Sequence, residues 1–228
     1  MATPPLPGAV GISHLRVYDT EAPDGLRGGT PHLHTVCTEA YVVVGGEGAV
    51  QTLGADGFNE TPVHKGALVW FTPGTVHRLI NHGDLEIYVL MQNSGLPEAG
   101  DLVIAFGDEI LSDPRRYESF VALAPPTERR DAGVEGFLRW KAMYEAEGNT
   151  ALERLYRHAV SLVGGRAAAW RSRWESGALA VAQASGRQLD ALAAGDPTHL
   201  FASGVSTSRF DVAERRLGCC GTLGVPVA

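Results

Sequence analysis

Four side chains in the first third of the sequence have the types and spacing of a metal site. His32 and His34 are separated by one residue, Glu39 follows after four more, and His77 lies further downstream. Alternate side chains of a β-strand point to the same face, so the first two histidines are expected to lie side by side. Three imidazoles and one carboxylate suit a divalent first-row metal ion. The pattern therefore predicts a single mononuclear metal site.

Short β-strands must position these four side chains. Runs rich in β-branched and apolar residues recur between glycine-rich turns such as Gly45-Gly46-Glu47-Gly48 and Pro73-Gly74. The strands predicted in this way are 12–18, 32–37, 39–44, 48–53, 61–64, 67–72, 76–81 and 85–91. Many short strands at such close spacing indicate a β-sandwich or a small β-barrel.

The second half of the chain has a different composition and a helical pattern. Residues 1–100 contain 4 Lys+Arg and 10 Asp+Glu, a net charge of -6, whereas residues 101–228 contain 15 and 16, a net charge of -1. Apolar residues at 3–4 spacing predict helices over 114–124, 134–147, 149–163 and 166–194. Asn149 is expected to cap the third of these helices. The predicted organisation is an N-terminal arm (1–10), a barrel domain (11–95), a linker (96–113), a helical extension (114–195) and a C-terminal tail (196–228).

Charge and cysteine content restrict the partners and the compartment. The net charge is -7, which argues against nucleic acid or an anionic membrane surface as a partner. No run of about 18 apolar residues predicts a membrane-spanning helix. Three cysteines do not form a disulfide framework, so we expect a reducing compartment, the cytoplasm.

The segment from Gly28 to Asn81 resembles the cupin superfamily in two motifs. The first motif stands here as Gly28 or Gly29, then His32-Leu33-His34, four residues, Glu39, six residues and Gly46. The second stands as Gly66, five residues, Thr72-Pro73-Gly74, two residues, His77, three residues and Asn81. Thr72 replaces the proline of the second motif, in a turn that does not supply a metal ligand. The two motifs match at nearly every fixed position.

This resemblance implies a mainly β fold with α-helices, a cupin-type jelly-roll β-barrel followed by a helical extension. It also implies that His32, His34, Glu39 and His77 are the metal ligands. Iron is the favoured metal, with manganese, nickel, zinc and copper as alternatives. Thiol dioxygenases of this superfamily use three histidines without the carboxylate, so Glu39 argues against that subclass.

The function that follows is a metal-dependent enzyme of small-molecule metabolism. We expect an oxygenase or dioxygenase that binds an oxygen-chelating substrate at the open metal positions, with Glu39 as the catalytic residue that relays a proton. Two alternatives stay open. One is a non-redox isomerase, cyclase or lyase that uses the metal as a Lewis acid. The other is a cupin that only binds a small ligand.

Four further residues could contribute to the site or have a purely structural role. Tyr41 alternates with Glu39, so it is expected to line the substrate cavity. Cys37 is expected in the core, and Cys219 and Cys220 in a packed tail. The outward sheet face, with segments such as 67–71, is apolar, and we expect a second copy of the chain to cover it in a homodimer.

Overall fold

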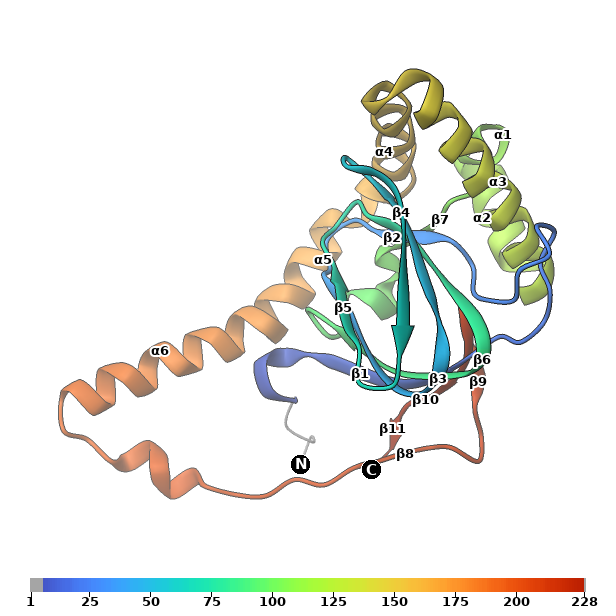
Figure 1. Cartoon of the computed structure of the whole chain (residues 1–228). Helices are drawn as coiled ribbons and strands as arrows, with labels where there is room; N and C mark the ends of the chain where they lie inside the picture. Colours follow the sequence, from blue (N-terminus) through green and yellow to red (C-terminus); the bar gives the residue numbers. More distant parts are fainter. Residues whose placement is uncertain (1–5, 228) are drawn as a thin grey trace.

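The computed structural model describes residues 6–227 and consists of an antiparallel sheet that curls into a barrel, with a layer of helices against it (Figure 1). The predicted N-terminal arm lies in part outside the described residues. The strands are β1 (Gly11–Val17), β2 (His32–His34), β3 (Glu39–Gly54), β4 (Gly57–His64), β5 (Leu68–Phe71), β6 (Val76–Met91), β7 (Leu102–Ile104), β8 (Arg209–Phe210), β9 (Arg216–Leu217), β10 (Gly221–Gly224) and β11 (Pro226–Val227). The main helices are α1 (Asp108–Leu111), α2 (Pro114–Leu123), α3 (Pro126–Glu147), α4 (Asn149–Val163), α5 (Ala167–Trp174) and α6 (Ala180–Ala193).

The long strands β3 and β6 form the centre of the sheet. The strand order is β4-β3-β6-β1-β10-β9, with β5 paired to β3, and with β2 paired to both β6 and β7. Inside the barrel, alternate side chains of these strands form one apolar core that includes Tyr41, Val43, Leu79 and Ile87. This alternation is what the sequence pattern predicted, and the mainly β fold with a helical extension is confirmed.

Two pairs of predicted strands are each one continuous strand. The segments 39–44 and 48–53 form β3, and 76–81 and 85–91 form β6. The glycines between them produce register shifts near Gly45 and Gly48 instead of a chain reversal. At Gly46 the backbone φ is 68°, and a Cβ there would lie 2.2 Å from the carbonyl oxygen of Asp84. Glycine therefore permits a close strand crossing at this point.

The helices pack against the sheet through a second apolar core. Trp140 and Phe137 of α3 are almost fully buried, and the indole N–H of Trp140 donates to the carbonyl oxygen of Phe106 over 2.7 Å. At Gly136 a Cβ would lie 2.3 Å from the carbonyl oxygen of Ala105, so glycine allows α3 to approach the chain beyond β7. The helix α3 starts at Pro126, eight residues earlier than predicted, because proline is well suited to the first helical turn.

The third predicted helix is not capped by Asn149. The N-cap position of α4 is Gly148, with φ 60° and no side-chain hydrogen bond, and Asn149 is the first helical residue. The fourth predicted helix is continuous, and the π-helical turn Glu175–Leu179 joins α5 to α6 without a break. Among residues 6–227, none of the helices has both the length and the apolar character needed to cross a bilayer.

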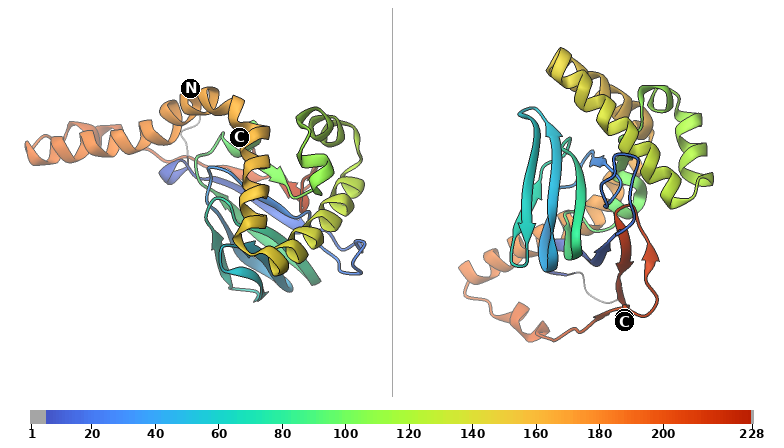
Figure 2. Two further views of the ribbon diagram at one scale, coloured as in Figure 1. Left: turned by 90° about the horizontal axis from the view of Figure 1, so that it is seen from above. Right: turned by 45° about the vertical axis from the view of Figure 1, so that its right-hand side comes forward.

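The sheet includes segments that the sequence pattern assigned to the linker and the tail. Within 96–113, β7 pairs with β2, and within 196–228, β10 pairs with β1. Between the helical layer and β8, α6 and the chain that follows stand away from the body and then return to it (Figures 1 and 2). This projecting segment exposes Leu189, Leu192, Leu200 and Phe201.

Candidate metal centre

Three neighbouring strands, β2, β6 and β3, bring the four candidate ligands together at one end of the barrel. His32 of β2 is the register partner of His77 of β6, and Glu39 begins β3 on the other side of β6. Strand alternation points both β2 histidines inward and turns Leu33 into the core between sheet and helices. All four candidate ligands are at most 6% exposed.

Their ligand atoms converge to the separations that a metal ion requires. The three imidazole nitrogens and one Glu39 oxygen lie within 4.8 Å of one another. The oxygen Oε2 of Glu39 is 2.9 Å from Nε2 of His77, 3.1 Å from Nε2 of His34 and 3.9 Å from Nε2 of His32. Two ligands about 2.1 Å from a metal lie about 3.0 Å apart at right angles and about 4.2 Å apart when opposite. The distances from Glu39 to His77 and His34 fit adjacent positions, and the distance from Glu39 to His32 lies between the values for adjacent and opposite positions.

Each histidine is oriented by an oxygen behind its ring. The Nδ1 atom of His32 lies 2.8 Å from the carbonyl oxygen of Thr30, and that of His77 lies 3.1 Å from the carbonyl oxygen of Thr75. An Nδ1–H donating to these oxygens leaves the Nε2 lone pair directed at the centre. This arrangement is the one by which proteins fix metal-binding histidines.

For His34 the oxygen is a carboxylate, Asp101, which the sequence pattern did not reveal. Its Oδ2 is 3.2 Å from Nδ1 of His34, and the side chain is fully buried. It also accepts backbone N–H bonds from Val36 (2.8 Å) and Cys37 (2.9 Å), and both N–H and hydroxyl from Thr35. No local signal marks Asp101, since it lies 67 positions from His34 in a stretch without periodicity.

The electrostatics of the cluster suit a bound cation. Burial alone would neutralise Glu39, but the imidazoles of His77 and His34 hold the pKa of its carboxyl well below the usual value. Burial opposes protonation of His34, yet the carboxylates of Asp101 and Glu39 outweigh it and raise the pKa of His34 to about 9. The buried Oε2 of Glu39 is surrounded by the Nε2 atoms of the three histidines. Because all three Nδ1 atoms face acceptors, a metal ion fits the remaining lone pairs directly.

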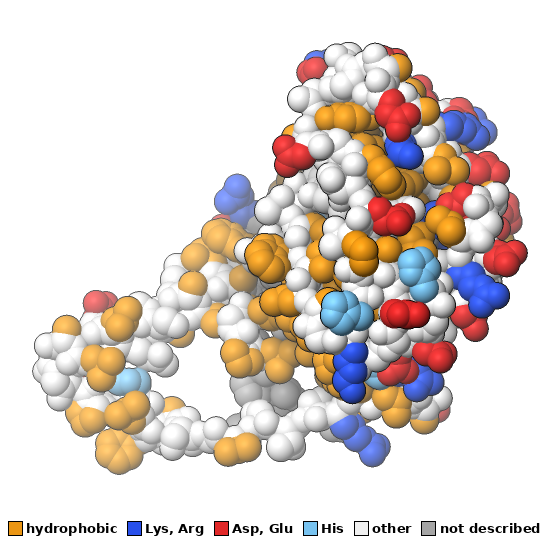
Figure 3. Space-filling model, viewed as in Figure 1, with side chains coloured by type: hydrophobic (Ala, Val, Ile, Leu, Met, Phe, Trp, Pro, Cys, Tyr) orange, Lys and Arg blue, Asp and Glu red, His pale blue; other side chains and the backbone are white. Residues whose placement is uncertain are grey.

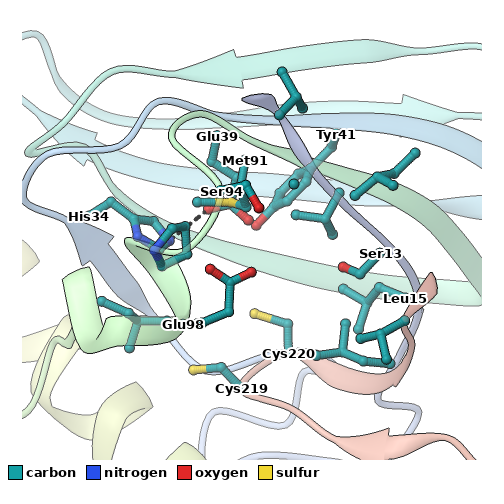
Figure 4. Close-up of a pocket in the computed structure, with 18 of the residues that line it drawn as sticks. Ser13, Leu15, His34, Glu39, Tyr41, Met91, Ser94, Glu98, Cys219 and Cys220 are labelled. Carbon is teal, nitrogen blue, oxygen red and sulfur yellow. Dashed lines mark ion pairs between the residues drawn. The ribbon is translucent and has the colours of Figure 1, made fainter. Parts of the chain in front are cut away.

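A cavity of about 440 Å³ opens beside the four ligands (Figure 4). Its walls are mainly apolar and include Ile12, Leu15, Val89, Met91, Leu102 and Leu223. Besides the ligands, Tyr41 and two cysteines, the polar groups that face it are Ser13, Ser94 and the carboxylate of Glu98, which lies between His34 and the cysteines. A cavity with this lining accommodates a small molecule with an apolar body and a few polar atoms.

The remaining sequence candidates lie at different distances from this cavity. Tyr41 lines it, and its buried hydroxyl has no hydrogen-bond partner in the described part of the chain. Burial and the nearby Glu39 carboxylate raise the pKa of Tyr41 well above its usual value. Cys37 lies in the core as expected. Cys219 and Cys220 were expected to pack in a tail, but both line the cavity because β10 completes the barrel wall.

Comparison with known proteins agrees with this architecture. Residues 20–92 match the family model described as the cupin domain. A search of curated proteins finds no match.

Among solved structures, the chain is similar to Streptomyces PAC13 in complex with uridine, with 15% identity over 38% of this chain and 61% of that one, at a TM-score of 0.30. It is also similar to a double-stranded β-helix protein from Klebsiella pneumoniae, with 20% identity over 36% of this chain and 64% of that one, at a TM-score of 0.28. The capsular polysaccharide assembling protein CapF from Staphylococcus aureus is 21% identical over 40% of this chain and 24% of its own, at a TM-score of 0.29. The chain thus spans less than two thirds of each of these structures, and the similarity concerns the fold alone.

Proposed function

Because residues 20–92 form a cupin domain, we propose that the chain is a metal-dependent enzyme of small-molecule metabolism, and specifically an oxygenase acting on an oxygen-chelating substrate. One observation carries the proposal: four buried ligand atoms converge, and three of their residues, His32, His34 and Glu39, line a 440 Å³ cavity with mainly apolar walls. A substrate of phenol or enol type matches that cavity, since it combines an apolar body with oxygens that bind a metal.

The metal would be held by His32, His34, Glu39 and His77. Four protein ligands leave about two positions of an octahedral ion for other molecules. Iron held by these residues would bind the substrate oxygens and react with O2. Manganese, nickel, zinc or copper are alternatives for the same ligand set.

The side chains around the cavity supply orientation and proton transfer. The hydroxyl of Tyr41 is buried and without a partner, so it is placed to donate a hydrogen bond to a substrate oxygen. Glu39 is the catalytic proton carrier of the proposal, because its Oε2 is directed at the centre and its carboxylate is ionised. The apolar walls exclude water from the reacting end of the substrate.

Metal content and oxygen consumption together test this proposal. Protein purified without added metal is analysed for its elements, and oxygen uptake is then measured across a panel of phenols and enols. We expect iron near one equivalent and uptake with at least one compound. The His34→Ala variant is expected to lose the metal while keeping its fold, as judged by circular dichroism. Purified, folded protein without any metal would contradict an enzymatic role and leave a ligand-binding protein.

A non-redox isomerase, cyclase or lyase is the second candidate, and the position of Glu98 favours it. With Glu39, this residue places two carboxylates at the cavity, which is a common arrangement for moving a proton between two substrate atoms. Stoichiometric zinc, substrate turnover and no oxygen uptake would select this function over the oxygenase.

A homodimer through the outer sheet face is also proposed. On this face Leu68 is 55% exposed and Trp70 is 64% exposed, and hydrophobic side chains gather on the side of the body that faces the α6 segment (Figure 3). Exposed apolar groups of this size mark interaction surfaces. Light scattering is expected to give twice the 24.2 kDa chain mass, and Trp70→Glu is expected to give the monomer mass.

A further inference from the structure

Two cysteines at the tip of a β-hairpin face the cavity from the side opposite Tyr41 (Figure 4). The strands β9 and β10 are antiparallel partners, and the turn between them contains Cys219 and Cys220. Consecutive side chains in a strand point to opposite faces. In this turn both sulfur atoms instead lie 3.9 Å from Nδ1 of His32.

The barrel holds this hairpin tip firmly in place. The carbonyl oxygen of Cys219 accepts from both the N–H (3.2 Å) and the hydroxyl (2.6 Å) of Thr30, and that of Cys220 accepts from the N–H of Tyr18 (3.1 Å). At Gly29 a Cβ would lie 2.8 Å from the Cβ of Cys220, so the approach requires glycine. All three cysteines of the chain are free. The two thiols are therefore held in a fixed position next to the imidazole of His32.

The separations match those between ligands of a thiolate-bound metal ion. A metal at about 2.3 Å from sulfur and about 2.1 Å from nitrogen gives a sulfur–nitrogen distance of about 3.6 Å at a tetrahedral angle and about 3.8 Å at 120°. Both observed distances are 3.9 Å. The two sulfur atoms and the histidine nitrogen lie within 4.8 Å of one another. The two sulfur–nitrogen separations thus already suit one ion, and the Nδ1 atom of His32 must give up its hydrogen bond to Thr30.

We propose that Cys219, Cys220 and His32 form a second metal site, selective for a soft, thiolate-preferring ion such as Cu⁺, Zn²⁺ or Cd²⁺. Thiolates select such ions, whereas the set with Glu39 accepts harder ones. His32 presents Nε2 to the first set and Nδ1 to the second. Binding through Nδ1 releases the proton of this atom to solvent and replaces its hydrogen bond to the carbonyl oxygen of Thr30. The inference is independent of the reaction proposed above.

Titration of the reduced, full-length chain with Cd²⁺ tests the proposal. Thiolate-to-cadmium charge-transfer absorption in the ultraviolet is expected to saturate at one equivalent. The absorption is expected to persist in His34→Ala, which disables the first site, and in Cys37→Ser, the matched control for the third cysteine. It is expected to be lost when both Cys219→Ser and Cys220→Ser are present. An unchanged signal in this double variant, or none in the parent chain, overturns the proposal.

A second measurement needs no substitution at the site. Iodoacetamide labelling of Cys219 and Cys220 is followed by peptide mass spectrometry, with and without one equivalent of metal. Cd²⁺ is expected to slow the labelling of both cysteines at least tenfold, and Mn²⁺ to leave it nearly unchanged. Equal rates with and without Cd²⁺ contradict the site. Equal protection by Mn²⁺ also contradicts it, since a hard ion would then act only by filling the cavity.

Discussion

Replacement of Asp101 by asparagine is expected to weaken metal binding without removing any ligand. The carboxylate Oδ2 faces two donors, the Nδ1 atom of His34 at 3.2 Å and the N–H of Cys37 at 2.9 Å. Asparagine keeps only one acceptor oxygen. Its NH2 group must therefore face the donors at either the Oδ1 or the Oδ2 position. The Oδ1 position faces three donors, two from Thr35 and one from Val36, so the oxygen is expected there and the NH2 group beside His34. His34 then loses the acceptor that keeps its Nε2 lone pair directed at the metal.

The size of the effect follows from this lost contact. Removal of a carboxylate behind a metal-binding histidine costs 10–100-fold in metal affinity, or about 1.4–2.7 kcal/mol of binding free energy. The fold is also destabilised, because each buried donor left without an acceptor costs about 1–3 kcal/mol. Asp101→Asn is therefore expected to lose both metal affinity and folding stability. Unfolding of the metal-free protein measures the loss of stability separately.

The assay is a competition titration with Mn²⁺ on Asp101→Asn and on the parent chain, alongside urea unfolding of both metal-free proteins. Asp24→Asn is the matched control, since Asp24 pairs with the fully buried Arg78, whose side chain points to the opposite face of β6 from that of His77. The control is expected to lose stability but to keep its metal affinity. An affinity of Asp101→Asn within twofold of the parent would refute the role assigned to Asp101.

Two further predictions concern pH and the cavity. The pKa of His34 is about 9 in the metal-free fold, above the unfolded value of about 6.5. The stabilisation by protonated His34 is therefore complete below pH 6.5 and is lost as the pH rises through 9. Urea unfolding should show a loss of about 3 kcal/mol in the unfolding free energy over this interval, and His34→Ala should give a flatter pH profile. An equal slope in His34→Ala would contradict this account. Tyr41→Phe removes a buried hydroxyl that has no hydrogen-bond partner among the described residues. The unfolding free energy should therefore stay within about 1 kcal/mol of the parent value, while KM for the substrate should rise about tenfold. An unchanged KM would exclude a hydrogen bond from Tyr41 to the substrate.

The features that the sequence predicted correctly are those encoded over short distances along the chain. The one-residue spacing of His32 and His34 places both rings on the same strand face. The 3–4 spacing of Leu152, Leu155 and Ala159 likewise gives the buried face of α4. In each case the local pattern has a unique structural consequence.

The features that it missed depend on contacts between distant segments. The strand β10 has the sequence Gly-Thr-Leu-Gly, which has little β-forming tendency, and it forms because β1 offers an open edge some 200 residues earlier in the chain. Glu98 similarly lies in a segment that looks like a linker, and only the folded barrel places its carboxylate at the cavity. Neither position could be inferred from composition or periodicity.

The helical extension has a defined relation to the metal centre. Asp101 immediately precedes β7, which pairs with β2, the strand that carries His32 and His34. The chain after β7 is held under α3 by the hydrogen bond from Trp140 to Phe106. The helices therefore do not act on the metal ligands directly. They fix β7, and β7 keeps the Asp101 carboxylate behind the His34 ring, so the barrel alone would lack one of the three oxygens that orient its histidines.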